Sequence, residues 1–97
     1  MKAYLVLDIT VHDDKRFKTY VDEIPDIIAR HGGRYIVQGV KPTCLEGEWT
    51  HERLVIIEFP DRAHAEALLS DPDAQQLFEL RHGTTTGRLL LAEGCTP

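Results

Sequence analysis

Two carboxylates in strand-like segments are the first residues whose type and place could support chemistry. Asp8 lies in KAYLVLDIT and Glu58 lies in RLVIIEF. If these segments pair as neighbouring strands, the two carboxylates could share a site, which raises one pKa and keeps an acid available at neutral pH. The alternative is two rim carboxylates that are hydrated or paired with Arg or Lys.

His31 and Arg81 are the other candidates for a reaction. His31 ends an apolar helical stripe and could line a pocket as a general base. Alternatively, it is a helix C-terminal His that the helix dipole favours and that bonds a free carbonyl. Arg81 could clamp a ligand carboxylate, although a salt bridge or the charge at a helix end explains it equally well.

Trp49 and Glu46 occupy an acidic loop and could close a pocket over a ligand. Core packing or a dimer contact is the alternative for Trp49, because large aromatic side chains dominate the energetics of cores and interfaces. His51-Glu52 begins like HExxH, but Val55 stands where the second His is needed. We therefore predict no metal site, and the absence of P-loop, GxGxxG and GxSxG motifs predicts no bound cofactor.

The elements that must position these residues follow from hydrophobic periodicity and from turn signals. We expect strands over 2–10, 34–39, 53–59 and 86–93, a long helix from Asp13 or Asp14 to Gly32, a helix from Asp61 to about Leu69, and a short helix from Asp71 to Gly83. Gly39 and Pro42 should interrupt the second strand, which 44–46 could resume as a bulged strand. The order β-α-β-β-α-β predicts an α+β, ferredoxin-like fold with an antiparallel four-stranded sheet and helices on one face. We expect residues 1–97 to form a single domain.

The alternation of side chains predicts a second apolar face on the sheet. Ala3, Leu5, Leu7 and Ile9 should face the helices, as should Val55, Ile57 and Phe59. The open face then takes Tyr4, Val6, Asp8, Thr10, Leu54, Ile56 and Glu58, and we assign Leu89, Leu91 and Glu93 to it as well. Such a face is too apolar for the surface of a monomer, so we predict a homodimer closed sheet to sheet.

Composition excludes several other partners. The chain has 97 residues, 11 Lys plus Arg, 16 Asp plus Glu and a formal net charge of −5, without a basic run to follow a nucleic-acid backbone. The apolar runs are far shorter than the ~20 residues of a membrane span, and no signal peptide is recognisable. We expect a cytoplasmic protein whose two cysteines, Cys44 and Cys95, are unpaired thiols.

The segments AYLVLDITVHD, FKTYVDEIPDIIARHGGRYIVQG, LEGEW, ERLVIIEFPDRAHAEALLSDP and TTTGRLLLAEG occur in this order along essentially the whole chain. In this respect the chain resembles the DUF1330 family of the dimeric α+β barrel superfamily. The resemblance implies a ferredoxin-like fold that pairs into a dimeric barrel, and only fold-level analogy for its chemistry. Matching positions are Asp8, Tyr20, Gly32, Gly33, Tyr35, Glu46, Gly47, Trp49, Glu58 and Arg81. Gln38 stands where family members commonly carry Arg, and Asp73-Ala74-Gln75 stands where they commonly carry Glu-Tyr-Gln.

Two functional hypotheses follow. The first is binding of a small organic ligand in a pocket between the sheet and the first helix, with Asp8, Tyr20, Tyr35, Gln38, Glu46 and Trp49 as ligand-binding candidates. The second is a cofactor-independent enzyme, monooxygenase-like or isomerase-like, that acts on a small carbonyl or aromatic metabolite. Its catalytic candidates are His31, Glu58 and Arg81: His31 would abstract a proton, and Arg81 or Gln38 would hold the oxyanion.

Overall fold

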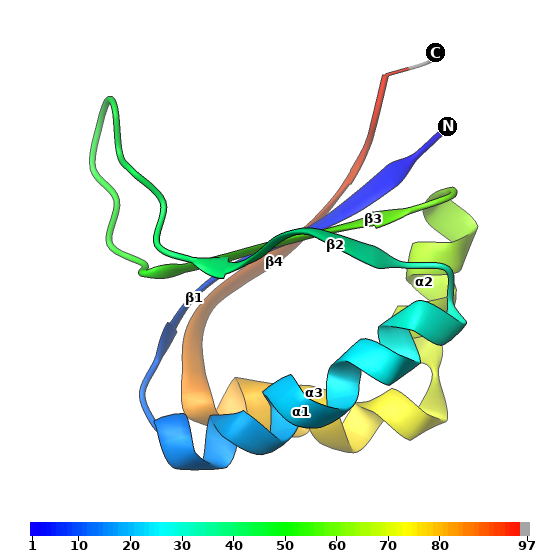
Figure 1. Ribbon diagram of the computed structural model, residues 1–97, viewed down its shortest axis with the longest axis horizontal. Coiled ribbons are helices and arrows are strands. Elements are labelled where there is room, and N and C mark those ends of the chain that lie inside the picture. Colours follow the sequence, from blue (N-terminus) through cyan, green and yellow to red (C-terminus); the bar gives the residue numbers. More distant parts are fainter. Residues whose placement is uncertain (96–97) are drawn as a thin grey trace.

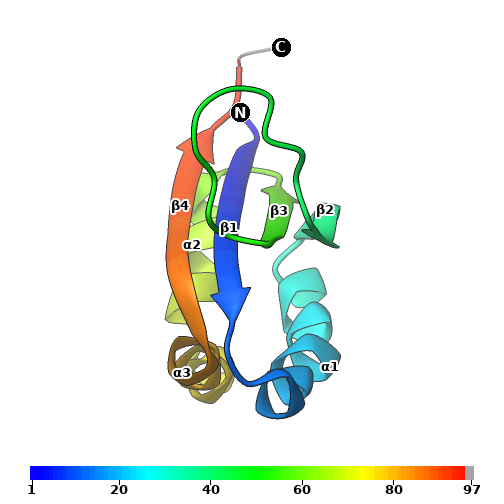
Figure 2. The same cartoon turned by 90° about the vertical axis from the view of Figure 1, so that its left-hand side faces the viewer.

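Four antiparallel strands form one sheet in the order β2-β3-β1-β4 in the computed structural model, which describes residues 1–95. The strands are β1 (Ala3–Val11), β2 (Arg34–Val40), β3 (Arg53–Phe59) and β4 (Thr85–Glu93). The helices are α1 (Asp14–Arg30), α2 (Arg62–Ser70), the short 3-10 helix η1 (Pro72–Ala74) and α3 (Gln75–Thr84). All helices lie on one side of the sheet, as Figures 1 and 2 show. The predicted ferredoxin-like α+β fold is confirmed.

Three aspartates begin the helical segments as the sequence predicts. The side chains of Asp13, Asp61 and Asp71 accept hydrogen bonds from backbone N–H groups in the first turns of α1, α2 and η1. Helix α3 continues one residue beyond the predicted end at Gly83. The reason is a side-chain cap, because the hydroxyls of Thr84 and Thr85 donate to carbonyls of the last turn.

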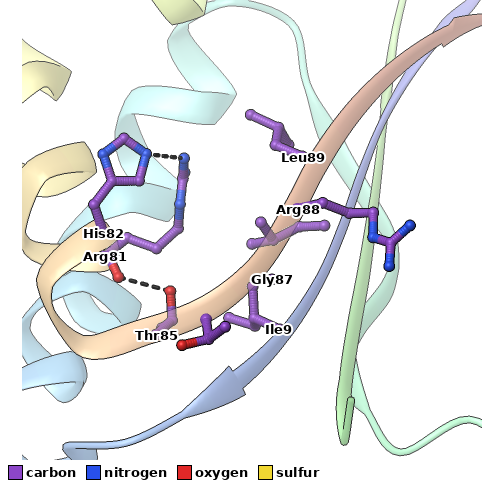
Figure 3. A pocket seen from close by; sticks show the side chains of 9 residues that line it. Ile9, Arg81, His82, Thr85, Gly87, Arg88 and Leu89 are labelled. Atoms are coloured by element: carbon purple, nitrogen blue, oxygen red, sulfur yellow. Dashed lines mark hydrogen bonds between the residues drawn. The ribbon is translucent and has the colours of Figure 1, made fainter. Parts of the chain in front are cut away.

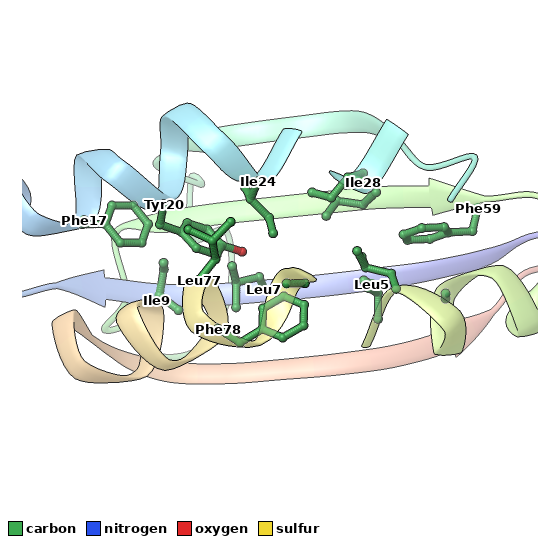
Figure 4. Close-up of a cluster of buried hydrophobic side chains, with 14 residues drawn as sticks. Leu5, Leu7, Ile9, Phe17, Tyr20, Ile24, Ile28, Phe59, Leu77 and Phe78 are labelled. Carbon is green, nitrogen blue, oxygen red and sulfur yellow. The ribbon is translucent and has the colours of Figure 1, made fainter. Parts of the chain in front are cut away.

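The core lies between the sheet and the helices (Figure 4). It contains Leu5, Leu7 and Ile9 from β1, Ile57 and Phe59 from β3, Phe17, Tyr20, Ile24 and Ile28 from α1, and Leu68, Leu77 and Phe78 from the other helices. The predicted alternation of β1 and β3 is therefore confirmed. Gly33 allows the chain to enter β2 close to this core, since a Cβ there would lie 2.7 Å from the Phe59 ring.

The prediction for β4 is wrong by one residue. Leu89 pairs with Leu7 and Leu91 pairs with Leu5, so both pack against the core on the helix side. Glu93 also belongs to that side and lies 3.6 Å from Arg62 of α2. Three consecutive leucines give β4 no alternation of its own, so pairing with β1 decides which residues face the helices. Arg88, Leu90 and Ala92 take the open face instead.

An apolar row crosses the open face of the sheet. Val37, Ile56, Val6 and Leu90 are successive cross-strand neighbours on β2, β3, β1 and β4, and we call these four residues the apolar row. Polar residues flank it along the strands, with Tyr4 and Glu58 on one side and Asp8 and Arg88 on the other. The open face therefore has an apolar centre and charged borders.

The segment between β2 and β3 departs from its prediction. Register shifts in β2 confirm a bulged strand, but residues 44–46 do not resume it. Residues 41–52 form a loop that extends away from the helices, beyond the open face of the sheet (Figures 1 and 2). His51 Nδ1 lies 3.0 Å from Thr10 Oγ1 and holds the end of this loop against β1. Within residues 1–95, no helix combines the length and the hydropathy needed to cross a bilayer.

Candidate functional site

A pocket of about 330 Å³ opens between β1, β4 and the last turn of α3 (Figure 3). Leu7, Ile9 and Arg81 are buried residues that line it, whereas His82 and Thr86 are exposed lining residues. The pocket therefore has a buried interior and a solvent-accessible rim. Leu89 contributes to it from β4 because this strand turns Leu89 toward the helices.

Gly87 brings β4 close to β1 beside this pocket. It pairs with Ile9, and its φ of 155° lies outside the ordinary range of residues with a side chain. A Cβ at this position would lie 2.8 Å from Ile9 Cα and would collide with the Asp8 carbonyl oxygen. Only glycine allows this approach of the two strands, which makes Gly87 a positioning residue of the pocket wall.

Arg81 is the most unusual side chain of the pocket. It is 6% exposed, and Nη1 donates to Tyr20 Oη at 3.2 Å. Nη2 lies 3.4 Å from His82 Nε2, and the guanidinium carbon lies 5.7 Å from the centre of the Tyr20 ring and 5.1 Å from that of Phe78. Arg81 is a candidate from the sequence alone, whereas His82 is not, because its only signal is its position next to Arg81.

Three of the predicted ligand-binding residues line a smaller cavity between the sheet and α1. Tyr20, Tyr35 and Gln38 contribute to this cavity, whose volume is about 60 Å³. Tyr20 also reaches a third cavity of about 20 Å³ that it shares with Arg81. Burial, together with the neighbouring Tyr20, raises the pKa of Tyr35 to about 12, so its phenol stays protonated at neutral pH. Tyr20 and Arg81 thus stand between the cavity beside α1 and the pocket beside α3.

The expected pairing of Asp8 with Glu58 is not found. Strand β1 does neighbour β3, but Glu58 pairs with Tyr4 and Asp8 pairs with Leu54. The two carboxylates are therefore on opposite sides of the apolar row and cannot form one acid site. Hydrogen bonds from Arg34 and Lys2 lower the pKa of Glu58, as the rim alternative expects.

Asp8 is buried at the other border of the apolar row. Its Oδ1 lies 3.4 Å from Arg88 Nε. That oxygen is inaccessible to solvent and accepts no hydrogen bond from the described part of the chain. Asp8 faces the open side of the sheet, so it does not line the pocket beside α3.

His31 also lies away from the pocket. Its Nε2 is 2.7 Å from Asp71 Oδ2, and its backbone N–H donates to the Ile28 carbonyl at the end of α1. The hydrogen bond from the His31 side chain lowers the pKa of Asp71. His31 lines none of the cavities described above; it ends the helix as the alternative expects, but its side chain bonds the Asp71 carboxylate and not a free carbonyl of the helix end.

Glu46 and Trp49 remain outside these cavities as well. Both lie in the loop 41–52, and Trp49 is 45% exposed. This exposure excludes core packing of Trp49 within one chain. Cys44 and Cys95 are free thiols, as predicted. Within residues 1–95, no three His, Cys, Asp or Glu side chains are grouped closely enough to hold a metal ion.

Comparison with known families gives one match, which covers almost the whole chain. The family described as "Domain of unknown function (DUF1330)" matches residues 2–95. None of the curated proteins compared with the chain matches it.

Solved structures share the fold at low sequence identity. A protein of unknown function from Rhodopseudomonas palustris has a TM-score of 0.81 and 16% identity, with 99% of this chain and 84% of that chain covered. SnoaB, a cofactor-independent oxygenase from Streptomyces nogalater, has a TM-score of 0.67 and 17% identity over 99% of this chain and 95% of that one. A dimeric ferredoxin-like protein of unknown function from Jannaschia sp. CCS1 has a TM-score of 0.70 and 12% identity, with 99% and 100% covered. At these identities the likeness is one of fold alone.

Proposed function

The chain belongs to the DUF1330 family, and from its geometry we propose that it is a homodimer that binds one small organic molecule per subunit. The ligand site is the pocket between β1, β4 and α3. One observation carries the proposal: a pocket of about 330 Å³ brings apolar side chains of β1 and β4 together with a buried cationic side chain. Its volume lies within the ~300–1,000 Å³ of small-molecule sites, in which a few fixed polar groups orient the ligand.

The walls of the pocket suit a ligand with an apolar body. Leu7, Ile9 and Leu89 supply apolar surface, and Thr85 supplies a hydroxyl. Thr85 Oγ1 donates to the Arg81 carbonyl, so its lone pairs can accept a hydrogen bond from a ligand. The exposed rim at His82 and Thr86 lets such a molecule enter without an opening of the helices.

The apolar row supports assembly through the open face. Its four side chains lie side by side across all four strands on the side of the sheet that no helix covers, and contiguous apolar patches of this kind mark protein interaction sites. A second copy is the proposed occupant because the row is self-complementary about a two-fold axis, and structural relatives are described as dimeric. Two such sheets packed face to face would form the dimeric barrel.

The alternative of an enzyme that abstracts a proton through His31 finds no support in this geometry. His31 is held by Asp71 outside the pocket, and Glu58 lies at the border of the open face with Arg34. At the pocket itself, His82 Nε2 accepts from Arg81 Nη2 at 3.4 Å, and no Asp or Glu of the described residues lines the pocket. Binding is therefore the function that the arrangement supports best. We include a cytoplasmic location in the proposal, because free thiols such as Cys44 and Cys95 are typical of a reducing compartment.

Ligand binding is tested by nuclear magnetic resonance titration of the ¹⁵N-labelled protein with benzamide and, separately, with benzoate. We expect saturable shifts for amides that surround the pocket, such as those of Ile9, Thr85 and Leu89. Amides of the exposed Ala63 and Ala67 on α2 serve as internal controls. Shifts that are scattered over the surface, or that rise linearly without saturation for both probes, would refute the proposed site.

A further inference from the structure

Arg81 carries a positive charge that the described part of the chain does not neutralise. The exposed Arg30, Arg34 and Arg62 each reach a carboxylate oxygen within 4.0 Å. Buried Arg81 has no such partner among the side chains of residues 1–95, although it is 6% exposed. The Coulombic attraction between two opposite charges is strongest where water is excluded. The molecule therefore lacks a counter-ion at the place where one would be most effective.

The groups that surround Arg81 hold the guanidinium without neutralising it. Tyr20 Oη and His82 Nε2 contact the guanidinium without a carboxylate between them, and the rings of Tyr20 and Phe78 offer cation–π contacts. A guanidinium has five N–H donors in a planar fork, and these two hydrogen-bond partners occupy one donor on each terminal nitrogen. The remaining donors are available to an acceptor from the pocket. Figure 3 shows the Arg81 and His82 side chains beside one another on one flank of it.

We propose that the ligand of this pocket is a small organic monocarboxylate, whose carboxylate pairs with Arg81 and whose apolar body rests on Leu7, Ile9 and Leu89. This inference rests on the proposed small-molecule site and names its ligand class. A planar carboxylate matches the guanidinium fork. We expect one carboxylate on the ligand rather than two, because Arg81 is the one arginine that a ligand in the pocket would meet. Arg88, the other arginine of the pocket, directs its guanidinium away from Arg81 in Figure 3 and lies beside Asp8.

A purely structural role accounts poorly for this arrangement. A buried charge that serves stability is normally paired and hydrogen-bonded, since an unpaired one is costly to desolvate. An apolar side chain of similar length would fill the same space between Tyr20 and Phe78 without that cost. A cation that is positioned by aromatic rings and left open toward a pocket is instead suited to recognise an anion.

The test compares benzoate with benzamide, which have nearly the same shape but differ in charge. Dissociation constants are measured for the 97-residue chain by the same titration at fixed ionic strength. We expect benzoate to bind about tenfold more tightly than benzamide, or better, because the neutral amide cannot form the charge-assisted pair. In Arg81→Met this preference should fall to within about twofold. The matched control is Arg30→Met, which removes the same charge from an exposed site that lines none of these cavities.

Each outcome has a separate meaning. Equal affinities of the two probes for the wild type overturn the carboxylate assignment and leave the small-molecule site in place, whereas failure of both probes to bind refutes the site itself. A preference that survives in Arg81→Met, or that is lost in Arg30→Met, also overturns the assignment. If Arg81→Met does not fold, the Arg81 side-chain Nε–H resonance of the wild type decides: at saturation benzoate must shift it further downfield than benzamide does, because only the carboxylate accepts a charge-assisted hydrogen bond, and equal shifts with both probes overturn the assignment.

Discussion

A charge placed in the middle of the apolar row should separate the proposed homodimer into folded monomers. Ile56 is the residue to change, because it lies on β3 between Val6 of β1 and Val37 of β2. Its side chain faces away from the core, so Ile56→Asp leaves the packing between sheet and helices intact. The carboxylate would be hydrated in a monomer and buried without a partner in a sheet-to-sheet dimer.

The magnitude follows from the two-fold symmetry. Burial of an isoleucine side chain contributes ~1.5–3 kcal/mol, and both copies lose it, so the dimer loses ~3–6 kcal/mol before the cost of burying two carboxylates is added. This loss raises the dissociation constant by a factor of roughly 10² to 10⁴. A dimer that persists at micromolar protein concentration in the wild type should then be monomeric at the same concentration in the variant.

Sedimentation equilibrium over a range of micromolar concentrations measures the effect, and far-ultraviolet circular dichroism checks that the variant is folded. Ala67→Asp is the matched control, because it adds the same charge to an exposed site on α2, on the helix side of the sheet. We expect this control to remain dimeric. A wild type that is monomeric at every concentration, or an Ile56→Asp variant with an unchanged dissociation constant, would refute assembly through the open face.

Three further predictions concern the positioning of the site and its stability. Gly87→Ala should lower the free energy of unfolding by ~2 kcal/mol or more in urea titrations, because its Cβ meets the β1 backbone; Gly83→Ala, whose Cβ meets nothing within 4 Å in α3, should instead raise it slightly. Asp71→Asn should destabilise the protein at neutral pH, and the difference from the wild type should shrink in acid. The sign follows from the lowered pKa of Asp71: the stabilisation is fully present above its ordinary value of 3.8 and is lost as the pH falls through the folded-state value. A difference that is independent of pH down to strong acid would contradict this role of the His31 contact. Burial raises the pKa of Tyr35 to about 12, so this phenol should ionise last in an alkaline absorbance titration. Its contribution to stability should decline as the pH rises from 10.0 toward that value. The late absorbance transition must be missing in Tyr35→Phe.

Local signals in the sequence were sufficient for the elements and their order. Aspartates at 13, 61 and 71 cap the helices where predicted, and the alternation of β1 and β3 separates core residues from open-face residues. The strand β4 was placed on the wrong register because the run Leu89–Leu91 is apolar on both faces. Pairing with β1 decides which of these leucines face the helices, and the sequence of β4 alone carries no signal for this choice.

The candidate site was harder to predict, because distances along a strand depend on register. Asp8 and Glu58 are on adjacent strands, as expected, but the pairing of Glu58 with Tyr4 separates the two carboxylates. The sequence around His31 is compatible with a pocket residue and with a residue that ends a helix. The contact with Asp71, forty residues further along the chain, decides between these two roles, and it is present only in the folded chain. Arg81 could be identified as a candidate, but its lack of a counter-ion is a property of the folded chain and has no signal in the sequence.

Strand β4 links the two proposed functions through alternate residues. Leu89 faces the helices and lines the pocket, while Leu90 belongs to the apolar row on the open face. Side-chain changes at these adjacent positions should therefore act on different functions, because each contacts only one face of the sheet. The backbone of β4, in contrast, belongs to both surfaces. At Gly87 it lies close to the backbone of the central strand β1, beside the pocket and the open face alike. A shift of β4 along β1 would move the wall of the pocket and the border of the dimer face together, and Arg88 lies at both surfaces, so any coupling between ligand binding and assembly is expected at this strand pair.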